Sequence, residues 1–190
     1  KSTIADLRWL RQSGLEAAVA KAASAGTLVF GICGGFQMLG RSIADPEGAE
    51  AAPGTEIAGM GLLPVDTVFR GEKVQIQTSG VFGPVQGALS GLTGLAYRGY
   101  EIHMGRGDGA LPPLVGGGNV YGSYIHGVFD APGVADAVVK ALCDAKGIDF
   151  TAVGTFDLAA YKERQYDLLA DAVRAGLDMD LVYRTLEGRA

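Results

Sequence analysis

One cysteine lies in a turn of the kind that enzymes use to present a nucleophile. Residues 29–30 (Val-Phe) are apolar and lead into residues 31–35 (Gly-Ile-Cys-Gly-Gly), after which an apolar helical pattern starts at Phe36. Glycines on both sides of Cys33 would relieve crowding in a sharp strand-to-helix turn. The helix that follows would favour the thiolate, and the N–H of Gly34 could donate to an oxyanion. The pattern predicts a cysteine nucleophile, and the residues leave open a buried structural cysteine in a tight turn.

A cysteine nucleophile needs a base, and the sequence holds two histidines. His126 follows a predicted strand over residues 119–125, so at the carboxyl end of a parallel strand it would open onto the same crevice as Cys33. His103 lies within a second predicted strand, where it shares a face with Glu101. We therefore expect His126 to be the base, although either histidine could be structural.

Other kinds of site fit the sequence less well. Its histidines and cysteines have no zinc spacing, so no metal site is expected. The glycine-rich residues 105–118 precede neither a Lys-Ser/Thr pair nor a helix, which argues against a phosphate loop or a dinucleotide site. Cys143 lies in the middle of a predicted apolar helix and should be inert. Two cysteines far apart in sequence suit a reducing cytoplasm.

The composition excludes several broad classes of protein. Of 190 residues, 48% are hydrophobic and 19% are charged, which argues against a disordered chain or a coiled coil. A net charge of −5 argues against binding to nucleic acid or to an anionic membrane. No apolar run approaches the roughly 20 residues of a membrane helix.

The elements that must position these residues follow from hydrophobic periodicity. Helices are predicted over residues 3–25 (capped by Thr3 and broken at Gly14), from residue 36, and over residues 133–145 and 157–175. Strands are predicted over residues 27–30, 100–104 and 119–125, with short antiparallel strands and tight turns between residues 61 and 97, and loops over residues 45–61 and 105–118. The pattern predicts an α/β fold with a mixed, mainly parallel sheet flanked by helices. We expect one domain over residues 1–150 and a helical C-terminal extension over residues 151–190 packed on it.

Three motifs resemble one known family. Residues 31–40 (GICGGFQMLG), 99–106 (GYEIHMGR) and 121–130 (YGSYIHGVFD) are similar to the glutaminase domain of cobyric acid synthases. That domain belongs to the cobalamin-pathway branch of the class I glutamine amidotransferases, which have a flavodoxin-like architecture. Residues 45–48 (DPEG), residues 59–65 (GMGLLPV) and the tail over residues 166–180 also fit.

The resemblance implies glutamine hydrolysis at Cys33. Cys33 would attack the side-chain amide, His126 would act as the base, and the N–H of Gly34 would stabilise the oxyanion. Many class I amidotransferases carry a glutamate two residues after the histidine, a position that is Val128 here. The resemblance therefore implies a Cys33–His126 dyad, with Glu101 as a candidate orienter.

The resemblance also implies which residues meet the substrate and which partners the domain has. Gln37, Tyr100 and Glu101 would line the glutamine pocket. The domain would need no cofactor, whereas ATP and Mg would belong to an N-terminal synthetase part of the same polypeptide that amidates corrinoid carboxylates. The family usually has a strand and a Leu-Pro-Gly-Ser loop before the position of Lys1, so we expect the domain to lack its first strands here. We expect a cytoplasmic enzyme, and the sequence leaves open whether it forms a homo-oligomer.

Three alternatives remain at this point. One is the glutaminase subunit of a peptidoglycan (lipid II) amidating enzyme, which is similar around the Gly-Tyr-Glu-x-His motif. Another is cobyrinic acid diamide synthase, a sister enzyme with the same chemistry on other carboxylates. A non-catalytic docking domain that keeps the fold is the third, and it predicts no thioester at Cys33.

Overall fold

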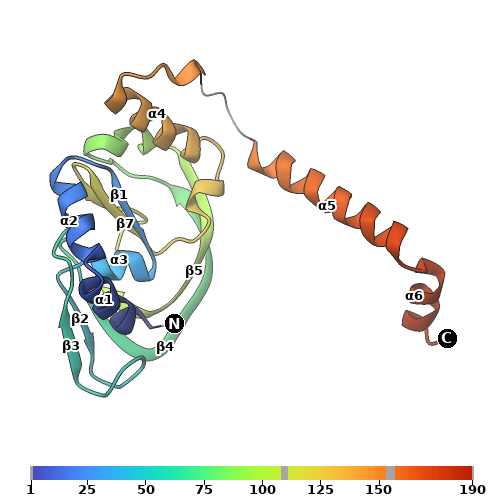
Figure 1. Cartoon of the computed structure of the whole chain (residues 1–190), viewed down its shortest axis with the longest axis horizontal. Helices are drawn as coiled ribbons and strands as arrows, with labels where there is room; N and C mark the ends of the chain where they lie inside the picture. Colours follow the sequence, from blue (N-terminus) through green and yellow to red (C-terminus); the bar gives the residue numbers. More distant parts are fainter. Residues whose placement is uncertain (1, 108–110, 153–156, 190) are drawn as a thin grey trace. The chain divides into compact units, whose positions relative to one another are not determined.

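The computed structural model describes residues 2–107, 111–152 and 157–189, in two compact units (Figure 1). Unit 1 spans Lys1–Gly154 and unit 2 spans Thr155–Ala190. The expected loop over residues 105–118 lies in part outside the described residues, because residues 108–110 are not described. The expectation that the C-terminal extension packs on the first domain stays a prediction.

A small sheet in unit 1 carries the cysteine turn. Its strand order is β1-β7-β6, with β1 over Val29–Ile32, β7 over Val120–Ser123 and β6 over Val115–Gly117. Strands β1 and β7 are parallel, with Ile32 opposite Ser123, whereas β6 is antiparallel to β7. Because the carboxyl ends of β1 and β7 reach one edge, the segments that follow them start side by side.

A second sheet has the strand order β3-β2-β4-β5. Its strands are β2 (Ser42–Asp45), β3 (Thr55–Ala58), β4 (Asp66–Val81) and β5 (Ala96–Gly107). Strand β2 is parallel to β4, and the long antiparallel pair β4–β5 curves along one side of unit 1 (Figure 1). The α/β class with helices flanking the sheets is confirmed. The sheets differ from the expectation in that antiparallel pairing predominates.

The prediction of several short strands between residues 61 and 97 is wrong, because β4 alone runs for 16 residues. The glycines taken as turn signals are accommodated within the strand. At Gly80, a Cβ atom would lie 2.8 Å from the Tyr97 hydroxyl on β5, so the aromatic ring covers the glycine across the pair. The predicted loop over residues 45–61 is also wrong in part, since it contains β3.

The helices follow the predicted pattern with shifted ends. The first predicted helix is α1 (Thr3–Gln12) and α2 (Leu15–Ser24), separated at Gly14, whose φ is 81°. After the cysteine turn comes α3 (Gly34–Leu39), and α4 spans Val134–Lys146. Thr3 is not the helix cap as predicted: it is a buried first residue of α1, and its hydroxyl donates to Oε1 of Gln37. Short 3₁₀ turns cover Gly87–Leu92, Val128–Asp130 and Phe150–Ala152.

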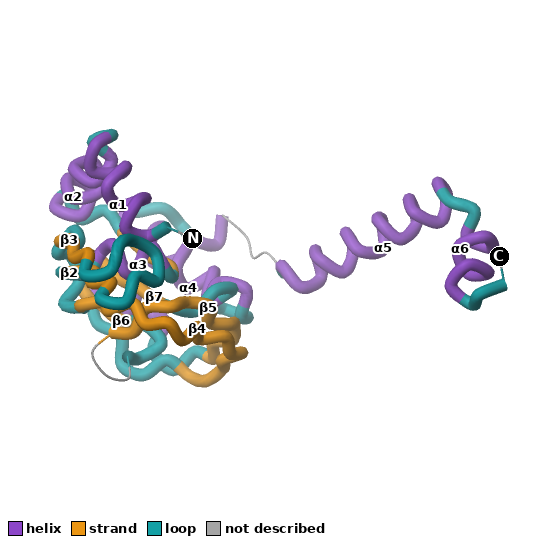
Figure 2. The backbone as a smooth tube through the Cα atoms, turned by 90° about the horizontal axis from the view of Figure 1, so that it is seen from below, coloured by secondary structure: helices purple, strands orange, loops and turns teal. Residues whose placement is uncertain are grey.

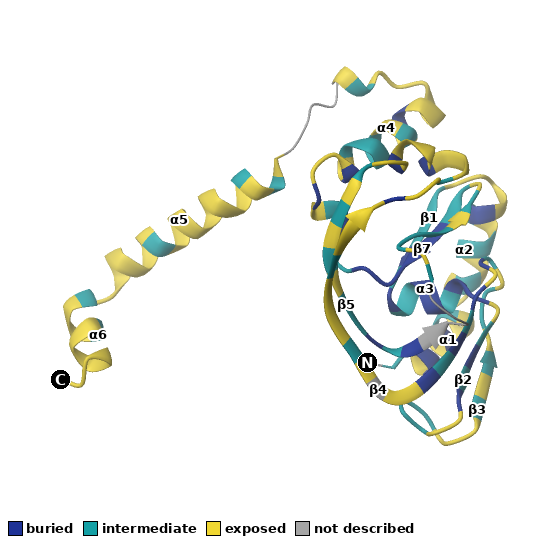
Figure 3. Ribbon diagram, turned by 180° about the vertical axis from the view of Figure 1, so that it is seen from behind, coloured by how far each residue is buried: buried dark blue, intermediate teal, exposed yellow. Residues whose placement is uncertain are grey.

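The buried side chains form three clusters. Figure 3 shows where buried residues lie along these elements. The cluster nearest the cysteine turn is built on Phe36, Leu39 and Tyr124, with the Phe36 and Tyr124 rings edge-on at 5.0 Å. Another packs α1 onto the second sheet through Ile4, Leu7 and partners there. Helix α3 is therefore held by apolar contacts on the side away from solvent.

Unit 2 is helical, as predicted. It contains α5 (Leu158–Gly176) and α6 (Met179–Leu186), shown as two successive helices in Figure 2. Asp157 and Asp178 cap these helices, since their carboxylates accept hydrogen bonds from the N–H groups of Ala160 and Leu181. Across the described ranges of both units, no helix combines the length and the apolar character that crossing a membrane requires.

The loop after β2 is organised by one buried carboxylate. Asp45 is 0% exposed and accepts hydrogen bonds from the backbone N–H groups of Ala49, Glu50 and Ala51, at 2.7, 2.8 and 2.7 Å. Burial raises the pKa of this carboxyl, but the backbone hydrogen bonds outweigh that effect and the pKa lies below its usual value. Glu50 in turn accepts the N–H of Thr3 at 2.7 Å, so the loop fixes the start of α1.

Replacing Asp45 by Asn should lower the free energy of unfolding by about 3 kcal/mol, because hydrogen bonds to a charged group are lost and partly buried N–H donors remain. Urea denaturation of the variant and of Glu56→Gln, an exposed carboxylate on β3, provides the comparison. Since the folded pKa is lowered, the stabilisation by Asp45 is present above the unfolded pKa of 3.8 and is lost as the pH falls through the folded pKa. A difference from the unmodified chain that is equally large at pH 7 and well below 3.8 would contradict this role.

Candidate active site

The backbone at Cys33 has a conformation that side chains rarely adopt. Its φ is 52° and its ψ is −110°, and within the described ranges it is the only residue other than glycine with a positive φ. The Cys33 N–H donates to the carbonyl of Ser123 on β7 at 2.8 Å, and its own carbonyl accepts the N–H of Gln37 at 3.0 Å. The residue thus joins β1 to α3 in a strained turn, as the sequence pattern predicted.

A cavity of about 480 Å³ opens beside this turn. It brings together Cys33, Gly34, Tyr100 and His126, four of the six residues proposed from the sequence. Its remaining walls come from the start of α1, the end of β1, α3 and β5: Ser2, Thr3, Asp6, Ile32, Gly35, Met38 and Ile102. Sequence reasoning missed the contribution of α1, because the residues that begin an amphipathic helix carry no signal of what they face.

His126 is held on the cavity wall by Tyr100. The two residues exchange backbone hydrogen bonds of 3.1 and 2.8 Å, and their rings stack at 5.1 Å with an interplanar angle of 5°. A Cβ atom at Gly99 would lie 2.1 Å from the carbonyl oxygen of His126, so glycine permits this close approach of β5. The Nε2 atom of His126 is buried and has no hydrogen-bond partner among the described residues.

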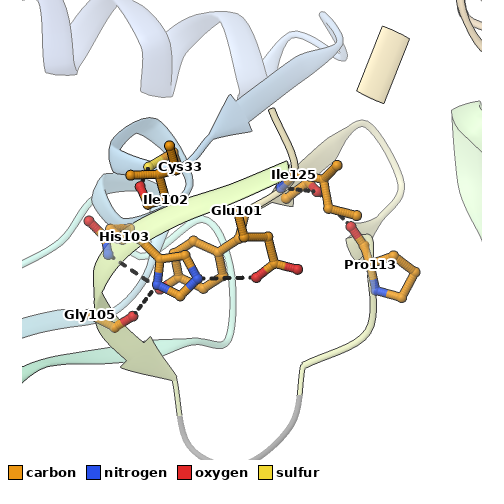
Figure 4. Close-up of polar contacts among 10 residues, drawn as sticks. Cys33, Glu101, Ile102, His103, Gly105, Pro113 and Ile125 are labelled. Atoms are coloured by element: carbon orange, nitrogen blue, oxygen red, sulfur yellow. Dashed lines mark hydrogen bonds and ion pairs between the residues drawn. The ribbon is translucent and has the colours of Figure 1, made fainter. Parts of the chain in front are cut away.

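Strand β5 turns alternate residues toward the cavity. Tyr100 and Ile102 line it, and the Ile102 carbonyl oxygen lies 3.5 Å from the Cys33 sulfur (Figure 4). Glu101 and His103 lie on the other face, as the period of two in a strand requires. Glu101 is absent from the cavity wall, and its Oε2 atom lies 3.1 Å from Nε2 of His103, so its role as the orienter of His126 stays a prediction.

His103 has a structural place in this arrangement. Its side chain is buried, and its Nδ1 atom lies 2.6 Å from the carbonyl oxygen of Gly105, so this nitrogen carries a proton (Figure 4). Its ring stacks on Tyr124 at 3.8 Å. Burial raises the pKa of the Tyr124 hydroxyl, and the nearby groups Cys33 and Glu101 contribute in the same direction. The His103 ring is thus held by buried contacts with Tyr124, Glu101 and Gly105, and the expectation that His126 rather than His103 is the base stays a prediction.

Gln37 also lies beneath the site. It is 0% exposed, its Oε1 atom accepts the Thr3 hydroxyl at 3.3 Å, and its Nε2 atom donates to the Tyr124 hydroxyl at 3.4 Å. Gln37 does not line the cavity, to which α3 contributes the neighbouring residue Met38, and its role in binding glutamine stays a prediction. Within the described parts of the chain, no group of three or more His, Cys, Asp or Glu side chains could hold a metal ion.

The family described as CobB/CobQ-like glutamine amidotransferase domain matches residues 1–134, and the chain belongs to it. The cobyric acid synthase of Lachnoclostridium phytofermentans is 47% identical over 212 residues, covering 98% of this chain and 41% of that protein. The cobyric acid synthase of Ruminiclostridium cellulolyticum is 43% identical, covering 98% and 40%. The chain thus spans about two fifths of the length of these curated relatives. A solved glutamine amidotransferase with 21% identity has a TM-score of 0.41, covering 75% of this chain and 73% of that one.

The turn at Cys33 should depend on Gly31 and tolerate a change at Gly35. A Cβ atom at Gly31 would lie 2.7 Å from Leu39 and 2.8 Å from the backbone carbonyl of Gly35, whereas a Cβ atom at Gly35 meets nothing within 4 Å. Gly31→Ala should lower the free energy of unfolding by about 1–3 kcal/mol through overpacking. Gly35→Ala should leave it unchanged or raise it by up to about 1 kcal/mol through helix propensity. Urea denaturation of both variants measures this, and equal losses would contradict the packing described at the turn.

Proposed function

We propose that this chain is the glutaminase domain of a cobyric acid synthase, which hydrolyses glutamine and supplies ammonia to the rest of the enzyme. The observation that carries the proposal is the strained Cys33 at the wall of a cavity that it shares with His126. A substitution at this position could relieve the backbone strain. Strain that is kept in spite of this is typical of a functional site. Membership of the glutamine amidotransferase family supplies the reaction class.

The first step forms a covalent bond between the enzyme and the substrate. Nε2 of His126 takes the proton of the Cys33 thiol, and the thiolate attacks the carbonyl carbon of the glutamine side chain. The negative charge moves to the carbonyl oxygen, where the N–H of Gly34 donates to it, because the first N–H groups of α3 have no partner within the helix. In the resting state, the Ile102 carbonyl is close enough to accept the Cys33 thiol.

The next steps release the two products. His126 returns its proton to the departing nitrogen, the C–N bond breaks, and ammonia leaves a γ-glutamyl thioester on Cys33. Water then attacks the thioester, losing a proton to His126. The C–S bond breaks, glutamate leaves, and the proton returns to the sulfur, so that the site is restored.

The destination of the ammonia is inferred from the relatives. Both named relatives are called cobyric acid synthases, and their similarity extends over the tail as well as the family match. We infer that an ATP- and Mg-dependent synthetase domain of the same polypeptide uses the ammonia to amidate corrinoid carboxylates. These relatives favour this enzyme over a peptidoglycan-amidating enzyme or cobyrinic acid diamide synthase. The strained nucleophile turn disfavours a docking domain without catalysis.

In the full-length enzyme, His126→Ala should lower glutamine-driven amidation by about 10²–10⁴-fold, the usual contribution of an acid–base group. Amidation driven by added ammonia should be retained, because the synthetase reaction does not need His126. Rates of amide formation with each nitrogen source measure the contrast.

His103→Ala is the matched control, since the chain has only these two histidines. Its loss of buried contacts should act through folding, so it should lower the thermal stability of the domain. Retained glutamine-driven activity in His126→Ala, or equal losses with glutamine and ammonia, would contradict the role of His126 as the base.

A further inference from the structure

The part of the cavity wall that comes from α1 carries the only carboxylate among the lining residues, Asp6. The other lining side chains are apolar, hydroxyl-bearing or absent, apart from the Cys33–His126 pair. The proposed chemistry uses that pair and Gly34, so it gives Asp6 no task. A carboxylate at the wall of a substrate cavity offers a strong acceptor for a cationic group.

The Asp6 carboxylate can accept further hydrogen bonds from such a group. Its Oδ1 atom accepts the Ser2 hydroxyl at 3.1 Å, and Ser2 itself lines the cavity. Its other oxygen accepts no hydrogen bond from the described residues, and the side chain is exposed. A carboxylate can accept about four hydrogen bonds, so a ligand can bind without displacing Ser2.

The position of Asp6 relative to Cys33 is fixed by the packing of α1. The Thr3 N–H donates to Glu50 at 2.7 Å and the Thr3 hydroxyl donates to Gln37, a residue of the cysteine-bearing helix α3. Ile4 and Leu7 are buried on the inner face of α1, on either side of Asp6 in sequence. Figure 1 shows the first turn of α1 close to α3. These contacts therefore fix the position of Asp6 relative to Cys33.

We propose that Asp6 binds the α-ammonium group of the glutamine substrate, and this inference rests on the proposed glutaminase function. Glutamine has an amide at one end, which must reach Cys33, and an ammonium and a carboxylate at the other. Ile32, Met38 and Ile102 give the cavity apolar wall for the methylenes between these ends. The ammonium needs an anionic partner to leave water, and Asp6 is the one that the cavity wall presents. Asp6 thereby selects free glutamine over amides that lack the amino group.

The test compares two substrates on one variant of the full-length enzyme. Asp6→Asn keeps the size of the side chain and removes its charge, and glutaramic acid is glutamine without the α-amino group. For glutamine, kcat/KM should fall by about 10–100-fold, the range for a hydrogen bond between charged groups. The fall should come mainly from KM, because the contact is present in both the ground state and the transition state. For glutaramic acid, kcat/KM should fall by less than about 3-fold, since the lost contact is absent.

Two further variants act as controls. Asp6→Glu should retain a preference for glutamine, because it keeps the charge, and Glu56→Gln should behave as the unmodified enzyme. An equal fall for both substrates, or no fall for glutamine, would overturn the assignment of Asp6 while the glutaminase proposal stands. If the unmodified enzyme released no glutamate from glutamine, both proposals would be overturned.

Discussion

The backbone conformation of Cys33 opposes folding by about 1–3 kcal/mol, as sparsely populated φ/ψ regions do, so its surroundings must over-determine it. Two kinds of contact do so here. The Cys33 N–H is tied to Ser123 on β7, and its carbonyl is tied to Gln37 in α3. Gly31, two residues before Cys33, lets α3 fold back against β1 at a distance that excludes any side chain at residue 31. Because β1 and β7 are parallel, the same pairing that holds Cys33 also delivers the segment that ends at His126.

A connected set of buried and partly buried polar groups supports the turn. Glu50 accepts a hydrogen bond from the N–H of Thr3, the first residue of α1. The Thr3 hydroxyl donates to Gln37, and the Gln37 amide donates to the Tyr124 hydroxyl. The Tyr124 ring lies on His103, which is bonded to Glu101 and Gly105. These contacts join α1, α3 and β5, three elements that contribute to the cavity wall. Polar groups that are hydrogen-bonded in this way rigidify a site, because breaking a hydrogen bond would leave an unpaired polar group at low dielectric, which costs free energy. Within the Gly-Tyr-Glu-x-His motif, Tyr100 thus lines the cavity, whereas Glu101 and His103 belong to the network that supports it.

The sequence predicted the candidate residues at the cavity more fully than the elements around them. Glycines around Cys33 and the strand end at His126 are local signals, so the turn and the placement of both residues at one cavity followed from them. Whether Gln37 and Glu101 point toward the cavity depends on which face of α3 and of β5 is turned to it. Only tertiary packing determines that orientation. The long β4 strand was missed because its glycines look like turns until Tyr97 covers one of them. The contribution of α1 to the cavity had no local signal, since nothing in an amphipathic pattern says what its first turn will face.

The central claim is that Cys33 forms a covalent γ-glutamyl intermediate. Full-length enzyme mixed with glutamine, quenched in acid and digested should yield the peptide that contains Cys33 heavier by the mass of glutamine less ammonia. The peptide with Cys143, a buried residue of α4, should be unchanged. Replacing His126 should reduce the yield of the modified peptide. A modified Cys143 peptide, or glutamate release with no adduct on Cys33 under rapid quenching, would contradict the account.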